Sequence, residues 1–299
     1  MDLTISPTGL KQWIAGTVIA LLLCGCSAGS VLDDVFGSGD TSKAELGDAL
    51  SPDLGPADDK QVAGLYNEGL SQLNSGNYKT AAVKFADVER RHPYSKWATK
   101  SLLMQGFSHY QRKSFDDAIN ACKRFISLHP GHKDTPYAYY LVGLSEYEQI
   151  NDIARDQSQT EKALESLEEV SRRFPESQYA VDAQKKVLVA RDHLAAKEME
   201  IGRYYLKRGS YLAAVNRFKR VVTDYQTTSH TPEALYRLSE GYMAMGVVSE
   251  AQTAAAVLGH NFPNSTWYRD AYQLVSSNGQ APVANDRSWI SRAFQGFTG

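Results

Sequence analysis

The sequence lacks the features that mark disulfide-rich, nucleic-acid-binding and membrane-spanning chains. Only three of its 299 residues are cysteines. Two of them, Cys24 and Cys26, lie near the amino terminus, so Cys122 is left without a partner for an intramolecular disulfide. The formal net charge of −2 gives no electrostatic reason to expect a nucleic-acid partner. The apolar run over residues 13–24 is too short to cross a bilayer as a helix, which takes about 20 residues.

Catalytic and metal-binding motifs are also absent. The sequence contains no G-x-S-x-G, no H-E-x-x-H and no P-loop. Its seven histidines include one close pair, His129 and His132, with no cysteine or third histidine nearby, whereas a structural zinc site needs about four ligands. We therefore expect no enzyme, no metal site and no cofactor. Cys122 is expected to act as a small buried apolar residue.

The amino terminus is typical of a bacterial export signal that ends in a lipid-attachment cysteine. Lys11 precedes the apolar run, and residues 23–26, Leu-Cys-Gly-Cys, resemble a lipobox. This resemblance implies that residues 1–25 are a signal peptide and that Cys26 carries a covalent N-acyl diacylglyceryl lipid. Because Ser27 and not Asp follows, it also implies a lipid anchor at the periplasmic face of the outer membrane. An ordinary signal peptide with a chance cysteine is the alternative.

Residues 26–60 are predicted to be a lipidated, disordered tether. They are poor in apolar side chains and rich in Gly, Ser and acidic residues, and Pro52 and Pro56 interrupt them. Such a composition cannot bury enough apolar surface to offset the entropy of ordering. A flexible tether of this length has an end-to-end distance of roughly 30 Å.

Residues 61–273 contain a repeated pattern of Gly, aromatic, Ala and Pro. Twelve residues separate the Ala from the Pro position in every set, although an insertion around residues 151–160 delays the third set and Gln226 replaces Pro in the fourth. The pattern resembles the tetratricopeptide repeat, in which small residues let two helices approach and Pro ends the second helix. We therefore predict an all-α fold, a right-handed α-solenoid of about five helix pairs. A plain helical bundle is the alternative. The Ala and Pro positions of the sets are Ala81 and Pro93, Ala118 and Pro130, Ala163 and Pro175, Ala214 and Gln226, and Ala251 and Pro263.

A stripe of aromatic and apolar residues follows the first helix of the first three pairs. In tetratricopeptide stacks this helix lines the concave face, so the stripe predicts a groove for an extended peptide with alternating hydrophobic side chains. Packing between neighbouring repeats is the alternative for any single residue. The stripe consists of Tyr66, Leu70, Leu73, Leu103, Phe107, Tyr110, Tyr137, Tyr140, Leu144 and Tyr147.

Several stretches resemble the BamD family, the lipid-anchored, five-repeat components of the outer-membrane β-barrel assembly machinery. They are residues 155–157, 174–180 with Ala183 and then 191–195, 200–205 and 208–217, and the similarity extends over about residues 60–265. The resemblance implies a scaffold that assists the folding and insertion of β-barrel proteins into the outer membrane.

The same resemblance implies the partners. These are the POTRA domains of BamA, the other lipoproteins of the machinery, and unfolded outer-membrane proteins, whose targeting segment is an extended strand with a terminal aromatic residue. Arg208 and Arg217 are the residues expected to contact acidic groups of BamA, and solvent exposure without a partner is their alternative. Two other functions stay open: a lipid-anchored scaffold for pilus, cell-wall or division machinery, and an enzyme that acts on cell-wall polymer.

Residues 274–299 depart from the repeat and are assigned to a carboxy-terminal tail. Trp267, Tyr268 and Tyr272 suggest a capping helix before it, and residues 278–286 resemble a linker. A short apolar cluster then follows, which either binds another subunit or belongs to a disordered tail, and we favour disorder. The cluster consists of Trp289, Ile290, Phe294 and Phe297.

Overall fold

The structure is a computed structural model that describes residues 57–150, 152–153 and 155–295. All of these residues belong to one compact unit, Ser51–Gly299. The predicted signal peptide, the lipid site Cys26 and nearly all of the predicted tether lie outside the described residues. The tether prediction reaches too far at its end, because the first described helix already begins at Ala57.

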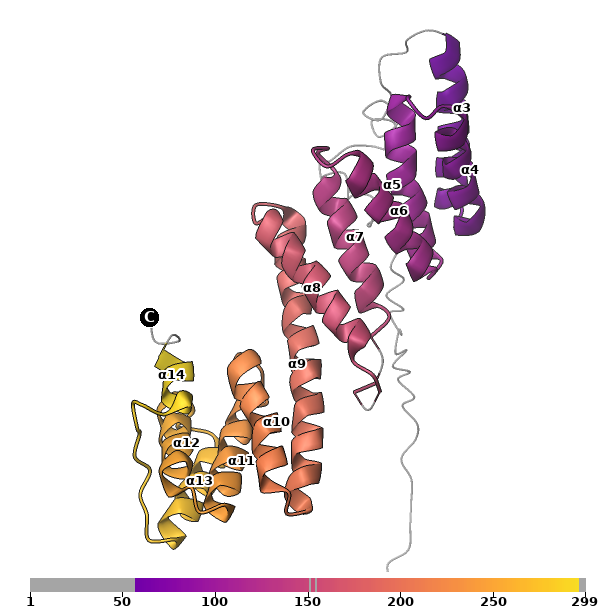
Figure 1. Ribbon diagram of the computed structural model, residues 1–299. Coiled ribbons are helices and arrows are strands. Elements are labelled where there is room, and N and C mark those ends of the chain that lie inside the picture. Colours follow the sequence, from indigo (N-terminus) through magenta and orange to yellow (C-terminus); the bar gives the residue numbers. More distant parts are fainter. Residues whose placement is uncertain (1–56, 151, 154, 296–299) are drawn as a thin grey trace, which may run out of the picture. The chain divides into compact units, whose positions relative to one another are not determined.

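The described residues form helices and no strands, arranged as five consecutive pairs followed by two single helices (Figure 1). Each helix packs mainly against the helices before and after it in the chain. The predicted all-α class built from helix pairs is therefore confirmed. The pairs are α3 (Ala57–Asn74) with α4 (Tyr78–Arg91), α5 (Lys96–Gln111) with α6 (Phe115–Leu128), α7 (Thr135–Tyr147) with α8 (Ser158–Arg173), α9 (Gln178–Lys207) with α10 (Tyr211–Asp224), and α11 (Thr231–Ala244) with α12 (Val248–Asn261); α13 (Thr266–Ser277) and α14 (Trp289–Gln295) follow.

The repeated small residues lie where the two helices of a pair touch. All five repeated Ala side chains are fully buried. The repeated Gly faces a side chain of the partner helix: a Cβ added to Gly69 would lie 2.7 Å from the ring of Phe85, and one added to Gly106 would lie 2.6 Å from Sγ of Cys122. Cys122 is fully buried and unpaired, and burial raises the pKa of its thiol to about 12. Its predicted role as a small core residue is confirmed.

The two helices of the fifth pair also pack closely, but with different residues at the contact. At the register position of the repeated Gly it has Ser239, and opposite it, where the other pairs have Phe, Cys, Leu and Phe, it has Ala255. Both side chains are fully buried, and the Ser239 hydroxyl donates to the Ala251 carbonyl oxygen at 3.1 Å. A larger residue on one helix is thus matched by a smaller one on the other, which keeps the core densely packed.

The prolines end the second helices as predicted. α4, α6, α8 and α12 each stop two residues before a proline, and the intervening residue leaves the helical region with φ between −132° and −136° and ψ between 55° and 60°. Proline disfavours the helical conformation for the residue that precedes it. Tyr225 has a similar φ of −130° after α10, although Gln226 follows it.

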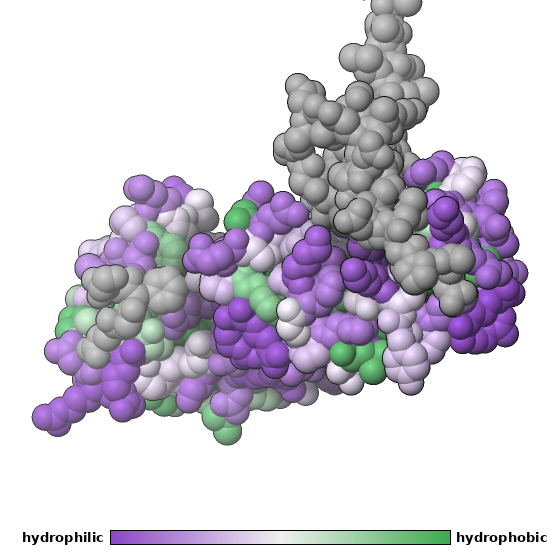
Figure 2. Space-filling view, turned by 90° about the horizontal axis from the view of Figure 1, so that it is seen from above, coloured by the Kyte–Doolittle hydropathy of each residue, from purple (hydrophilic) through white to green (hydrophobic). Residues whose placement is uncertain are grey.

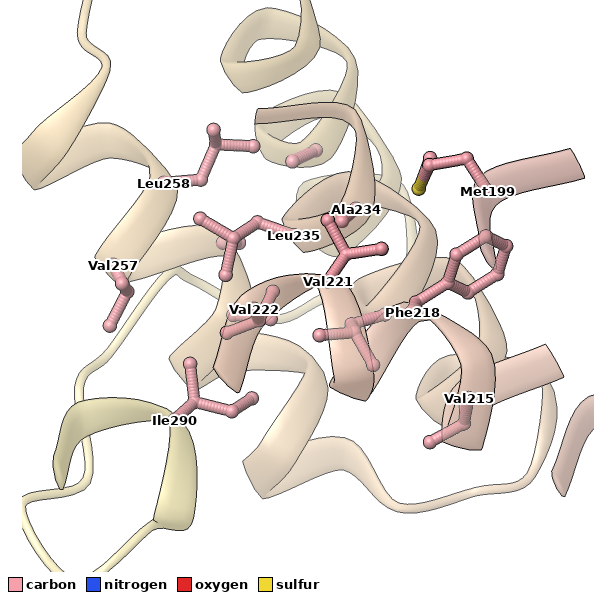
Figure 3. Close-up of a cluster of buried hydrophobic side chains, with 14 of the residues drawn as sticks. Met199, Val215, Phe218, Val221, Val222, Ala234, Leu235, Val257, Leu258 and Ile290 are labelled. Carbon is pink, nitrogen blue, oxygen red and sulfur yellow. The ribbon is translucent and has the colours of Figure 1, made fainter. Parts of the chain in front are cut away.

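Helix α9 is 30 residues long, about twice the length of most other helices. Its first half packs in a cluster with Leu167 and Val170 of α8. Its second half, including Leu194 and Met199, belongs to a larger cluster with α10 to α14 (Figure 3). One continuous helix therefore contributes to two hydrophobic clusters, one with α8 and one with α10 to α14.

The slight preference for a disordered tail is wrong for the part of the tail that the structure describes. α13 extends to Ser277, and α14 packs its apolar side against the last repeats. Ile290 is fully buried and lies close to Val222 and Val257 (Figure 3). The indole Nε1 of Trp289 donates to the Tyr242 hydroxyl at 3.0 Å. These apolar side chains find partners on α10 and α12, which offset the entropy of ordering a short segment. Phe297 lies outside the described residues.

Candidate functional site

Five of the ten residues predicted to line a peptide groove are buried. Tyr66 is representative, because its ring packs between Phe85, at a centroid distance of 5.5 Å, and Trp97, at 4.9 Å. Side chains buried in this way hold neighbouring repeats together and are not free to contact a ligand. For these residues the structure favours the packing alternative. They are Tyr66, Leu73, Leu103, Phe107 and Tyr137, each 2–6% exposed.

The other five, Leu70, Tyr110, Tyr140, Leu144 and Tyr147, are half-buried. The last four of them lie on α5 and α7, and α9 adds side chains to the same surface. The Tyr140 hydroxyl donates to the Asp182 carboxylate, and the Tyr140 ring stacks on Tyr179 at 5.3 Å. The Lys186 Nζ lies 5.1 Å from the centroid of the Tyr147 ring. We call this surface the tyrosine face; it consists of Tyr110, Tyr140, Leu144, Tyr147, Tyr179 and Lys186.

The hydroxyl groups of Tyr110 and Tyr140 on the tyrosine face remain protonated donors throughout the physiological pH range. Burial, reinforced by Glu148 and Asp182, raises the pKa of Tyr110 to about 12. Burial and the hydrogen bond to Asp182 raise the pKa of Tyr140 further. The face therefore offers flat rings with neutral hydroxyls and one cation, Lys186, whose Nζ lies 3.5 Å from an oxygen of Asp182.

Sequence reasoning missed the contribution of α9 to this face. Tyr179, Asp182 and Lys186 belong to the first half of the long helix, which the repeat pattern did not assign to any pair. A signal was available: 27 residues separate Pro175 from Gly202, whereas 13 separate Pro93 from Gly106. The extra length predicts an extended first helix in the fourth pair.

Arg208 is exposed at the turn between α9 and α10. Its guanidinium donates to the Tyr204 hydroxyl and lies 5.3 Å from the centroid of the Tyr204 ring. Tyr204, Tyr211 and Leu212 around this turn are 53%, 37% and 66% exposed. We call Tyr204, Arg208, Tyr211 and Leu212 the repeat-four patch. Figure 2 shows one face of the molecule, on which hydrophilic residues dominate and apolar residues form small separate groups.

Arg217 differs from Arg208 because it has a carboxylate partner within the chain. Its Nη1 lies 3.2 Å from Oε2 of Glu198, and Nη1 of Arg220 lies 2.6 Å from Oε1 of the same side chain. Glu198 is 7% exposed. A partner that approaches Arg217 would therefore have to share it with an internal, almost buried acid.

Among the described residues, no three His, Cys, Asp or Glu side chains are grouped so that they could hold a metal ion. The rings of His129 and His132 pack on Phe125, with centroid distances of 5.5 and 5.6 Å. Within the same part of the chain, no helix combines the length and the apolar character needed to cross a membrane.

These features define the class of the protein: a helical-repeat protein of tetratricopeptide-like pairs, with an aromatic face on its first helices and an exposed aromatic and arginine patch. A family model described as outer membrane lipoprotein, YfiO, matches residues 58–258. The chain belongs to this family, and its similar relatives are BamD proteins.

Two relatives illustrate the similarity. The outer membrane protein assembly factor BamD of Caulobacter vibrioides is 48% identical over 226 residues, which cover 76% of this chain and 74% of the relative. The protein of the same name from Rickettsia prowazekii is 41% identical over 260 residues, 87% of this chain and 94% of the relative. Among solved structures, the P58(IPK) TPR domain is 13% identical, covers 88% of this chain and 72% of its own, and has a TM-score of 0.37, a distant likeness from which nothing further follows.

Proposed function

We propose that this protein is a lipid-anchored scaffold of the β-barrel assembly machinery at the periplasmic face of the outer membrane. In this role it binds the POTRA domains of BamA and segments of unfolded outer-membrane proteins. The observation that carries the proposal is the similarity to relatives named outer membrane protein assembly factor, which extends over 87% of this chain in one case. The lipobox at Cys26 supports the anchor.

The tyrosine face suits an extended polypeptide. Tyrosine rings supply a large contact area at a low cost in side-chain entropy, and their hydroxyls supply hydrogen bonds. An extended strand presents alternate side chains to one surface, so its apolar side chains can contact the rings of Tyr110, Tyr140 and Tyr147. Backbone carbonyl oxygens of such a strand are acceptors for hydroxyl donors on the face.

The repeat-four patch suits a folded partner with acidic groups, which we assign to BamA. Tyrosine and arginine are among the residues enriched at the centres of protein interfaces. Stacking on Tyr204 holds the Arg208 guanidinium in one orientation before binding, which reduces the entropy lost in the complex. Arg217 is the second candidate contact, and Glu198 orients it.

The lipid on Cys26 places this scaffold near its membrane-embedded partner. A flexible tether of roughly 30 Å keeps the helix pairs close to the membrane without fixing their orientation. If docking to BamA contributes most of the localisation, Cys26→Ser reduces the efficiency of β-barrel assembly without abolishing it. Complete loss of assembly in this variant would show that the anchor is indispensable.

Depletion of the protein tests the proposed process. Several unrelated β-barrel proteins should decrease together in the outer membrane, and affinity purification from gently solubilised membranes should recover a large β-barrel protein with POTRA domains. Unchanged levels of β-barrel proteins would contradict the proposal and would favour a scaffold of pilus, cell-wall or division machinery.

Charge reversal tests the assigned interface. Arg208→Glu combined with Tyr204→Ala should greatly reduce the recovery of the POTRA-containing protein. Lys185→Glu is the matched control, because Lys185 is an exposed cation of the same helix α9 outside the repeat-four patch. Equal recovery with both variants would place the interface elsewhere.

A further inference from the structure

Lys100 is a cation in an unusual environment on α5. It follows Trp97 by one helical turn, and its Nζ lies 5.9 Å from the centroid of the Trp97 ring. Trp97, Leu103 and Phe107 on the same side of α5 are 4–6% exposed, whereas Lys100 is half-buried. The ammonium group therefore lies at the border between an apolar stripe and solvent.

Lys100 differs from every other half-buried lysine among the described residues. The other three have an acid within 4 Å: Lys84 Nζ lies 2.6 Å from Glu68, Lys186 Nζ 3.5 Å from Asp182, and Lys197 Nζ 3.8 Å from Glu200. No such ion pair of Lys100 exists within the described part of the chain. Asp134, the acid whose charge acts on Lys100, has an oxygen 3.6 Å from Nδ1 of His132 instead.

The surroundings of Lys100 favour a negative ligand. Burial, followed by the charge of Lys133, lowers the pKa of Lys100, and Asp134 compensates only in part. A partly desolvated ammonium without a counter-ion is unfavourable, and a second cation nearby increases this cost. An incoming carboxylate would relieve both effects and would form a charge-assisted hydrogen bond.

We propose that Lys100 is the group that recognises a carboxylate of the extended polypeptide bound along the aromatic side of α5 and α7, with exposed Lys133 adding to the positive potential. The carboxylate comes either from the carboxy terminus of that polypeptide or from an acidic side chain within it. This inference rests on the proposed binding of unfolded polypeptides and adds a charge requirement that aromatic side chains alone do not impose.

Peptide binding to the full chain in detergent tests this inference. A fluorescent, extended peptide with alternating apolar side chains, one internal Asp and a final Phe is compared with its carboxy-terminal amide and with its Asp→Asn form. For the unmodified protein, we expect one of the two changes to weaken binding about tenfold, the size expected when one hydrogen bond to a charged group is lost. The change that has this effect identifies the source of the carboxylate.

Variants of Lys100 complete the test. Lys100→Gln should bind the unmodified peptide about tenfold more weakly and should no longer distinguish it from the critical modified peptide, while Lys100→Arg should retain much of the discrimination. Lys79→Gln, at an exposed lysine of α4, is the control and should leave all affinities unchanged. Equal melting curves by circular dichroism establish that the variants fold alike.

Two outcomes would overturn the inference and are distinguishable. If all peptides bind the unmodified protein and Lys100→Gln equally well, Lys100 has no role in recognition, but the proposed scaffold function stands. If no peptide binds the unmodified protein, the proposed contact with unfolded polypeptides fails together with this inference.

Discussion

Two buried glutamates show how the first part of the repeat stack, from α3 to the first half of α9, differs from the second part, from the second half of α9 to α14. Glu146 on α7 is 6% exposed and Glu198 on α9 is 7% exposed. The nearest cation to Glu146, Lys123, is 3.9 Å away, and Oε2 of Glu146 has no hydrogen-bond partner. Both oxygens of Glu198, in contrast, contact arginines. A buried glutamate thus has only a distant cation in one region, whereas in the other both of its oxygens are paired with arginines.

The layer formed by the first helices shows the same contrast. From α3 to α9 it is joined mainly by rings, such as Tyr66 with Trp97 at 4.9 Å and Tyr137 with Tyr179 at 5.3 Å. From α9 to α13 it is joined by charges as well. The Glu233 carboxylate lies 2.9 Å from Arg203 and 3.3 Å from Arg237.

In the second part, the same arginine side chain makes ion pairs and packs on an aromatic ring. Arg237 Nη1 also lies 2.8 Å from Glu240, and its guanidinium carbon lies 5.6 Å from the centroid of the Trp267 ring. Lys100, which has no ion pair among the described residues, and Glu146, whose Oε2 has no hydrogen-bond partner, both lie in the first part. The second part therefore resembles a pre-formed platform, whereas the first part retains polar groups that are incompletely paired.

The largest loss of stability is expected from a substitution in the core of the fourth helix pair, α9 with α10. Phe218 is fully buried against Gly202, and Phe218→Ala should lower the free energy of unfolding by about 3–5 kcal/mol. Urea denaturation followed by circular dichroism measures the loss. Cys122→Ala, at the same register position in the second pair, removes one buried atom and should cost far less. Similar losses for both would contradict the packing difference between the pairs.

A double substitution sharpens this prediction. Gly202→Ala alone should be strongly destabilising, because the new Cβ would overlap the Phe218 ring. In the Phe218→Ala background the same change should cost less, since the ring is gone. Strictly additive losses would show that the two residues do not share one space.

The next largest loss of stability is expected from a substitution in the carboxy-terminal helix α14. Ile290→Ala should cost about 2–5 kcal/mol, because a fully buried side chain leaves a cavity. Hydrogen exchange should accelerate in α10, α12 and α14 and stay unchanged in α4 to α7. Val283→Ala is the control, since Val283 is 58% exposed. Unchanged exchange in α10 and α12 would mean that α14 adds nothing to the platform.

The sequence predicted the helix pairs well because sterically simple residues determine them. Gly, Ala and Pro act through size and backbone geometry within one pair, so their spacing reveals the pair directly. The tail could not be predicted in this way. Its order depends on contacts between residues far apart in the chain, such as the Gln226 amide that donates to the Ala293 carbonyl oxygen at 2.8 Å.

The candidate site was only half predictable for a related reason. A stripe at helical spacing identifies one side of a helix, but it does not distinguish a side chain packed between repeats from one that faces solvent. Tyr137 is 6% exposed, whereas Tyr140, one turn later, is half-buried. Both rings contact Tyr179 at 5.3 Å, on a helix that begins 38 residues after Tyr140 in the chain, so the local pattern does not predict how deeply each ring is buried.

Removing the charge of Glu198, which is paired with two arginines, is expected to cause an intermediate loss of stability. Glu198→Gln leaves two arginines with a neutral partner, but both arginine side chains are partly exposed, at 36% and 47%, and solvent reduces the cost. A loss of about 1–2 kcal/mol is expected, measured by urea denaturation. Lys84→Gln, which removes an ion pair between side chains that are 36% and 55% exposed, is the reference and should cost less than 1 kcal/mol.

The smallest change in stability is expected for Glu146→Gln, and this substitution should not destabilise the protein at pH 7. Burial raises the pKa of Glu146 above its ordinary value, and a hydrogen bond to Ser166 and the charges of Lys123 and Lys162 offset this only in part. A carboxyl group whose pKa is higher in the folded than in the unfolded state stabilises the fold when protonated, and this contribution is lost as the pH rises through the raised pKa. Glu146→Gln should therefore equal or exceed the unmodified protein in stability at pH 7, and its advantage should shrink as the pH falls toward 4.5. Denaturation midpoints measured across this range test the contrast with Glu198→Gln, and a loss of stability at pH 7 in both variants would mean that the two buried glutamates are equally well matched.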